Sequence, residues 1–156
     1  MFYTGHANDD GWAFPGHQDD GFLHFSEARY GNNDLEWLVV AACGPLQEDA
    51  PPHAWWQRWG PAFQGLHLLC GYQNVTADNV IEGMHWANYM LGGWTVRQAW
   101  MQTGMDSQGG NIRVAVMGVF DPKGVSNWND HFWGRGSVGP DILSLGGWWL
   151  VSAPVD

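Results

Sequence analysis

The stretch Leu35 to Ala42, LEWLVVAA, decides the predicted fold because it is an apolar run rich in β-branched residues. Such a run is typical of a central strand that is covered on both faces of a sheet. Cys43, Gly44 and Pro45 follow it directly, and glycine and proline end a strand. We therefore expect Cys43 at the C-terminal tip of a buried strand.

Strand-like and helix-like segments alternate on both sides of this stretch. We expect strands over Met1 to Thr4, Gly65 to Tyr72, Asn111 to Phe120 and Trp148 to Ala153, and helices over Ala54 to Phe63, Asn79 to Leu91 and Thr95 to Thr103. This alternation is typical of an α/β domain with a mainly parallel sheet flanked by helices. Ligands of such sheets bind beyond the carboxyl ends of the strands.

The size and composition predict one folded domain over residues 1–156. A chain of 156 residues is long enough for one core and too short for two ordinary domains. Its 45% of hydrophobic residues and 12 Trp bury enough surface to offset the entropy that folding costs.

The charge and hydropathy pattern exclude several classes of partner. Six Lys and Arg residues are scattered among 16 Asp and Glu, for a net charge of −10, so we expect no nucleic-acid partner. The longest apolar run, Trp37 to Cys43, is far shorter than the ~20 residues of a membrane span. We expect a soluble protein that binds no membrane. The N-terminus has no signal-peptide pattern, and the alternative is that the chain is part of a longer secreted protein.

Two residues at predicted strand ends suggest nucleophilic chemistry. If their strands are parallel neighbours, His6 and Cys43 would lie at the same edge of the sheet. The two residues would then be separated by about one strand spacing of 4.8 Å plus the reach of their side chains. A thiolate beside an imidazole base is an effective nucleophile. The backbone N–H of Cys43 and those of the turn after His6 are candidates for an oxyanion site. The alternative is that Cys43, like Cys70, is a packed thiol.

Several short motifs carry a resemblance to a known family. They are Tyr3-Thr-Gly-His6, Trp37-Leu-Val-Val-Ala-Ala-Cys43, Trp59 to Phe63, Gly65 to Tyr72, Thr95-Val-Arg-Gln-Ala-Trp100 and Asn129 to Gly136. Together they resemble the caspase-hemoglobinase superfamily of cysteine peptidases, which includes caspases, legumains, gingipains, clostripain and separase. They are similar, more narrowly, to an uncharacterised bacterial family within it. The resemblance covers roughly residues 3 to 152.

The resemblance implies a caspase-like three-layer α/β/α fold, a His/Cys dyad and a peptide or ester substrate. Cys43 would be the nucleophile and His6 the general base. Tyr72 to Val75 would form pocket walls. The remaining candidates for substrate binding are Ala7, Gly44, Trp12, Gln73, Asn74 and Asp78. Asp78 would favour a basic substrate group, although a helix cap is its alternative role.

Two departures from the superfamily bear on activity and assembly. The superfamily usually has Gly after the catalytic His, where this sequence has Ala7. Its sheet also has elements before the His-bearing strand, so we expect an N-terminally truncated domain. An uncovered strand edge is a template for pairing, which predicts a homo-oligomer.

The Asp-rich loop near the N-terminus is the one region whose residues could bind a metal ion. Two Asp-Asp-Gly repeats and nearby histidines give oxygen and nitrogen ligands, contributed by Asp9, Asp10, Asp19, Asp20, His17, His24 and His53. No HxH, HExxH or EF-hand spacing occurs, so a pair of Asp-Gly turns is the preferred interpretation. We expect no metal and no cofactor.

Three functions remain after these exclusions. The first is a cysteine-dependent hydrolase of amide or ester bonds. The second is a catalytically inactive binding or assembly domain, which Ala7 and the missing N-terminal elements favour. The third is an esterase that uses the same dyad on bulky aromatic substrates in a cleft lined by Trp12, Trp55, Trp56, Trp128 or Trp133, although packing is the preferred interpretation for each of these Trp residues.

Overall fold

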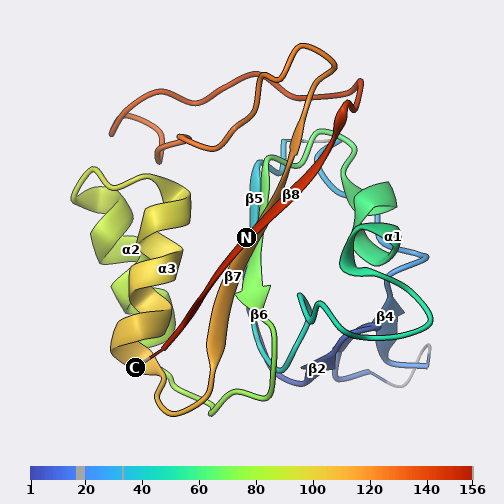
Figure 1. Cartoon of the computed structure of the whole chain (residues 1–156). Helices are drawn as coiled ribbons and strands as arrows, with labels where there is room; N and C mark the ends of the chain where they lie inside the picture. The colour runs from blue at the N-terminus through green and yellow to red at the C-terminus, as the bar shows by residue number, and fades with distance from the viewer. Residues whose placement is uncertain (17–19, 33, 156) are drawn as a thin grey trace.

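The computed structural model describes residues 1–16, 20–32 and 34–155, which form a central five-stranded sheet and smaller layers on its two faces (Figure 1). The strand order is β1-β5-β6-β7-β8. The strands are β1 (Phe2–Thr4), β5 (Trp37–Ala41), β6 (Leu68–Tyr72), β7 (Arg113–Phe120) and β8 (Gly147–Pro154).

The sheet is mixed, which corrects the prediction of a mainly parallel sheet. β5 pairs in parallel with β1 and β6, whereas β7 is antiparallel to both β6 and β8. The cause is the pair of helices between β6 and β7, α2 (Glu82–Leu91) and α3 (Val96–Ser107). At 1.5 Å per residue they are about 15 and 18 Å long, so the second helix returns the chain to the end of the sheet that it had left. β7 therefore starts beside the end of β6.

The two faces of the sheet are covered differently. α2 and α3 lie together on one face (Figure 1) and pack there against Trp37, Val39 and Cys70. The other face packs against Trp12 and Trp59. Its cover consists of α1 (Trp55–Trp59), the 3-10 turn η1 (Gly60–Ala62) and a small antiparallel sheet of β2 (Ala7–Asn8), β3 (Gly11–Ala13) and β4 (Phe22–His24). The prediction of a caspase-like three-layer α/β/α fold is therefore wrong.

Successive residues of β5 explain why its sequence is apolar throughout. Side chains of a strand alternate between faces, so Leu38 and Val40 enter one core while Val39 and Ala41 enter the other. All five β5 residues are buried. The prediction of a central strand covered on both faces is confirmed.

The remaining predicted elements are present, with one shift that affects a candidate residue. The second predicted helix begins at Glu82 with Ile81 as N-cap, so Asp78 does not cap it. α3 begins as expected after Thr95, whose hydroxyl accepts a hydrogen bond from the Gln98 backbone N–H at 3.2 Å.

The three-residue strand β1 forms one edge of the sheet. The homo-oligomer that this edge suggested stays a prediction. Among the described residues, the longest helix has 12 residues, and none is long and apolar enough to cross a membrane.

Candidate functional site

The carboxyl ends of β1 and β5 bring His6 and Cys43 to the same edge of the sheet. The two strands are parallel, with Phe2 opposite Val39 and Thr4 opposite Ala41. His6 and Cys43 each follow the last of these pairs by two residues. Neighbouring strands lie about 4.8 Å apart. The parallel pairing on which the dyad hypothesis depends is therefore present.

The two residues make separate contacts in this structure. The Cys43 thiol is partly exposed and lies 3.8 Å from the Thr76 carbonyl oxygen and 3.9 Å from the Thr76 hydroxyl. His6 is exposed, and its carbonyl oxygen accepts a hydrogen bond from the Ala13 N–H at 2.8 Å. No hydrogen bond between described residues joins Cys43 to His6. A working dyad requires the thiol to turn away from Thr76.

A small hollow of about 110 Å³ opens at the thiol. It brings together Cys43 and two predicted substrate-binding residues, Ala7 and Gly44. Ala7 belongs to β2, so the chain after His6 is a short strand and not the expected turn. Gly44 has φ +63°, a conformation that a side chain would strain. The other lining residues are Asn8, Asp9, Gln47 and Val75.

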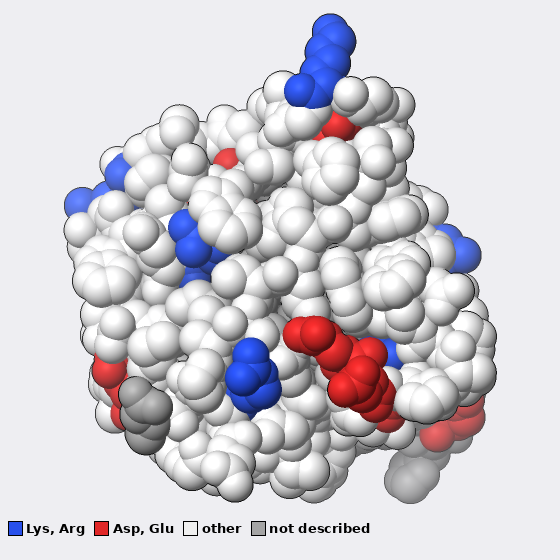
Figure 2. Space-filling view, in the orientation of Figure 1, with Lys and Arg blue, Asp and Glu red and all other residues white. Residues whose placement is uncertain are grey.

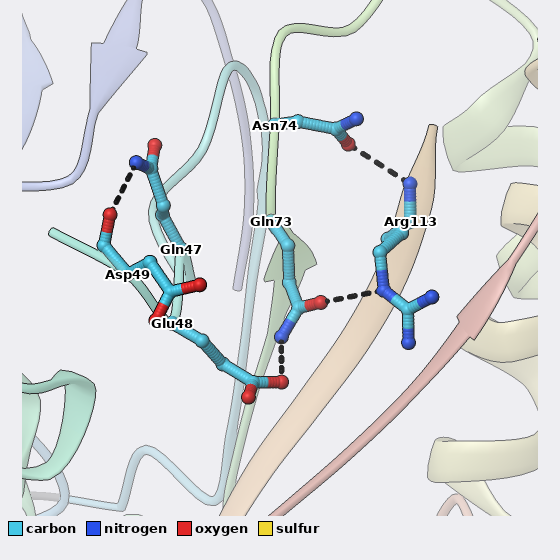
Figure 3. A pocket seen from close by; sticks show the side chains of 6 residues that line it. All are labelled: Gln47, Glu48, Asp49, Gln73, Asn74 and Arg113. Atoms are coloured by element: carbon cyan, nitrogen blue, oxygen red, sulfur yellow. Dashed lines mark hydrogen bonds between the residues drawn. The ribbon is translucent and has the colours of Figure 1, made fainter. Parts of the chain in front are cut away.

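A second, larger hollow has a volume of about 430 Å³ (Figure 3). Gln47 lines both. Gln73 and Asn74, which were predicted to bind substrate, line the larger one. Their backbone runs beside the thiol, since the Gly44 N–H donates to the Asn74 carbonyl oxygen at 3.0 Å. The remaining lining residues are Glu48, Asp49 and Arg113.

A chain of hydrogen bonds fixes the polar groups of the larger hollow (Figure 3). Gln73 is only 7% exposed, and its Nε2 donates to Glu48 Oε1 at 2.6 Å. Its Oε1 accepts from Arg113 Nε at 2.9 Å. Arg113 is further engaged by Ser152, whose hydroxyl accepts from the guanidinium at 2.8 Å.

The electrostatic balance of the larger hollow is negative. Two carboxylates, Glu48 and Asp49, face one guanidinium that is already bonded to Gln73 and Ser152. Within the described part of the chain, no hydrogen bond uses Glu48 Oε2 or the Asp49 carboxylate. On the face drawn in Figure 2, a group of acidic side chains lies in the lower half beside one basic side chain, and the other Lys and Arg residues are scattered. The hollow therefore favours a cationic group.

The loop that carries the two carboxylates is held by Arg58 of α1. The guanidinium is buried and donates to the carbonyl oxygens of Gln47, Ala50 and His53, the last two at 3.4 and 2.5 Å. Burial lowers the pKa of Arg58, an effect that the charge of Asp9 opposes. Arg58 thus holds the loop that carries Glu48 and Asp49, which we call the acidic wall, although Arg58 itself does not line the hollow.

Two predicted substrate-binding residues lie elsewhere. Trp12 is 1% exposed and its ring stacks on Trp59 at 4.8 Å between centroids, so its prediction as a groove residue is wrong. The reason is that β3 turns the ring into the core. Asp78 is exposed and lines neither hollow. No Trp is among the described residues that line these two hollows, so neither is the Trp-lined cleft that the aromatic esterase requires.

The remaining candidates from the sequence are Cys70 and the possible metal ligands. Cys70 is fully buried, and burial raises the pKa of its thiol. His17 and Asp19, two of the possible metal ligands, lie outside the described residues. In the described ranges no group of three His, Cys, Asp or Glu residues is arranged to hold a metal ion.

Sequence reasoning missed Gln47, Glu48, Asp49 and Arg113. The first three had a signal, because they follow the strand-ending Gly44 and Pro45 closely and so stay near the strand tip. Arg113 had none, since its place depends on the antiparallel direction of β7.

Comparison with known proteins gives one match. A family model described as "Domain of unknown function (DUF6345)" matches residues 1–153. No curated protein and no solved structure matches the chain.

Proposed function

The chain belongs to the DUF6345 family, and for this member we propose a cysteine-dependent hydrolase with Cys43 as nucleophile and His6 as general base. The observation that carries the proposal is the parallel register of β1 and β5, which brings both residues to one edge of the sheet, where Cys43 lines the small hollow. The resemblance of the motifs to the caspase-hemoglobinase superfamily stays a prediction.

The reaction would begin when His6 takes the proton of the Cys43 thiol. The thiolate attacks the substrate carbonyl carbon, and the oxygen becomes an oxyanion that nearby backbone N–H groups stabilise. The tetrahedral adduct then expels the leaving group, which receives the proton from His6. Water, activated by His6, hydrolyses the thioester, releases the acid and restores the thiol.

The larger hollow supports a cationic substrate group. Glu48 and Asp49 offer free carboxylate oxygens, and Gln73 and Asn74 are held by hydrogen bonds to Arg113. We therefore assign peptide or ester substrates with Lys or Arg next to the scissile bond. Charge-assisted hydrogen bonds to such a group contribute about 1.5–3 kcal/mol.

A second candidate function is the catalytically inactive binding domain. The observation that favours it is the bonding of the Cys43 thiol to Thr76 and not to His6. In structures without substrate, catalytic hydrogen bonds are often long and tighten only on binding. The two functions therefore differ in the reactivity of the thiol.

The test is the pH dependence of Cys43 alkylation by iodoacetamide, followed by mass spectrometry. A working dyad predicts fast alkylation below about pH 7, where an ordinary thiol of pKa about 8.5 reacts slowly. His6→Ala should slow it at least tenfold, while Cys70 serves as an internal buried control. If Cys43 is alkylated slowly, and at the same rate in His6→Ala as in the native protein, the dyad is contradicted and the inactive binding domain is favoured.

Turnover provides the second arm of the test. We would compare the cleavage rates of fluorogenic peptides with Arg, Lys, Asp or Leu before the scissile bond. The peptides with Arg or Lys should be cleaved fastest. Cys43→Ser should abolish this activity, and Cys70→Ser should not affect the chemistry. Cleavage that survives Cys43→Ser would contradict the proposed nucleophile.

A further inference from the structure

A separate hollow of about 290 Å³ lies at the opposite end of β5 from Cys43. Trp37 opens β5 and lines this hollow, whereas Cys43 follows the end of the strand. Six residues of strand span about 20 Å. The hollow is therefore distinct from the proposed hydrolytic site, and its other walls come from β1, α2 and the connection between β7 and β8.

Aromatic rings form much of its wall. The Trp37 and Trp133 ring centroids lie 4.6 Å apart, and Phe132 lies 5.8 Å from Trp133. Trp37 is 4% exposed, and its Nε1 already donates to Asp130 Oδ2 at 3.1 Å, so this N–H is not available to a ligand. Trp86, from α2, is a fourth aromatic wall residue.

Acidic groups add a negative charge to these walls. Asp34 and Glu36 line the hollow, and no hydrogen bond or salt bridge between described residues engages either carboxylate. Asp34 has φ 67°, a left-handed conformation that Asp tolerates better than most residues. The Met1 ammonium also lies here, donating to the Trp37 carbonyl oxygen at 2.7 Å. Two carboxylates against one ammonium leave a net negative charge.

We propose that this hollow binds a small organic cation, an ammonium or guanidinium group carried on apolar carbons. Aromatic faces attract such a cation through their negative π-clouds, and the carboxylates compensate its charge. The apolar walls require carbon atoms around the charge, which a hydrated metal ion lacks. The volume is at the small end of ligand pockets, so it suits one side chain or one small ammonium compound.

One further feature of the wall fits a ligand with an oxygen near its charge. Trp86 is 8% exposed, and its Nε1 is buried without a hydrogen-bond partner. Buried unpaired donors are uncommon in folded proteins. A ligand hydroxyl or carbonyl oxygen next to the cationic group would satisfy this donor after a small rearrangement.

The cation has two possible sources, a free ammonium compound or a Lys side chain of a peptide. Choline and Nα-acetyl-lysine methylamide represent them, and 3,3-dimethylbutan-1-ol is the neutral isostere of choline. We would titrate each into the protein and follow the indole N–H signals by ¹H–¹⁵N NMR. The cations should shift the signals of Trp37, Trp86 and Trp133, and the isostere should bind at least tenfold more weakly. The cation that binds more tightly identifies the source.

Substitutions make the test specific to this hollow. Trp133 is 53% exposed, so Trp133→Ala should fold and weaken cation binding at least tenfold. Asp34→Asn should weaken it several-fold. Trp56→Ala removes a similarly exposed Trp from α1 and should have no effect, as should Cys43→Ser. The proposal is overturned if neither cation binds, if the isostere binds equally well, or if Trp133→Ala binds like the native protein.

Discussion

The imidazole Nδ1 of His67 lies 2.5 Å from the carboxylate Oδ2 of Asp130, and both side chains are buried. The other ring nitrogen, Nε2, lies 3.3 Å from Asp141 Oδ1. Because ionised carboxylates only accept hydrogen bonds, these two contacts favour the protonated form of His67, in which both ring nitrogens carry a hydrogen. Asp130 also accepts from the Gly139 N–H at 2.9 Å. This charge pair thus fastens the connection between β7 and β8 to the sheet.

This arrangement predicts a pH-dependent stability. Burial alone lowers the pKa of His67, but the hydrogen bonds and charges of Asp130 and Asp141 outweigh it, so the pKa is raised. The contribution of His67 to the free energy of unfolding is therefore complete below the unfolded pKa of about 6.5. It is lost as the pH rises through the higher folded pKa.

Urea unfolding of the native protein and of His67→Gln, from about pH 6 to pH 9, measures this contribution. The native protein should be the more stable at the acidic end, and the difference should shrink as the pH rises. Other titrating groups are common to both proteins and cancel in the difference. A difference that is constant or grows with pH would show that His67 is neutral in the folded state.

Trp12 tests the assignment of a predicted groove residue to the core. Its ring lies between Trp59 and Tyr30, with centroids 4.8 and 6.1 Å away. Trp12→Ala should cost about 3–5 kcal/mol of unfolding free energy, and Trp12→Phe clearly less. Chemical denaturation gives these values. If Trp12→Phe instead leaves stability unchanged and alters KM, the ring contacts substrate and its core assignment fails.

Arg58 offers a test of how the acidic wall is held. Arg58→Met leaves the carbonyl oxygens of Gln47, Ala50 and His53 without their donor. The bond to the Ala50 carbonyl oxygen is buried, and a buried group left unpaired costs about 1–3 kcal/mol. We expect a lower Tm and faster hydrogen exchange in residues 43–53. The control is Arg29→Met, because Arg29 is exposed and its removal should change the stability by no more than about 0.5 kcal/mol. Equal effects of the two substitutions would contradict the bracing role.

Local signals explain which parts of the fold were predictable. The β-branched run of β5 and the Gly-Pro break after it establish a buried strand and its tip without any knowledge of the rest. The direction of β7 depends on both α2 and α3 lying on one face of the sheet, which no local pattern encodes. Trp12 was mispredicted for a similar reason, since its partner Trp59 lies 47 positions further along the chain.

The same distinction applies to the candidate site. Cys43 and Gly44 follow from one strand end, and Gln73 and Asn74 from the parallel strand beside it. Arg113 reaches the larger hollow only because β7 begins at the edge where β6 ends. Asp78 was expected near the site, yet the chain between β6 and α2 leaves it exposed and away from both hollows.

Asp78 therefore becomes the matched control for the last prediction, which concerns substrate charge. If the proposed hydrolase takes a basic group into the larger hollow, Glu48→Gln and Asp49→Asn should each lower kcat/KM for Arg and Lys substrates. A lost charge-assisted hydrogen bond of about 1.5–3 kcal/mol corresponds to roughly 10- to 100-fold. The rates for Leu substrates should change little, because the Cys43 thiol and His6 are untouched. Asp78→Asn removes the same charge from the protein outside the hollow and should leave the preference as it is. An equal loss in Asp78→Asn would mean that the overall charge of −10, and not the hollow, attracts basic substrates.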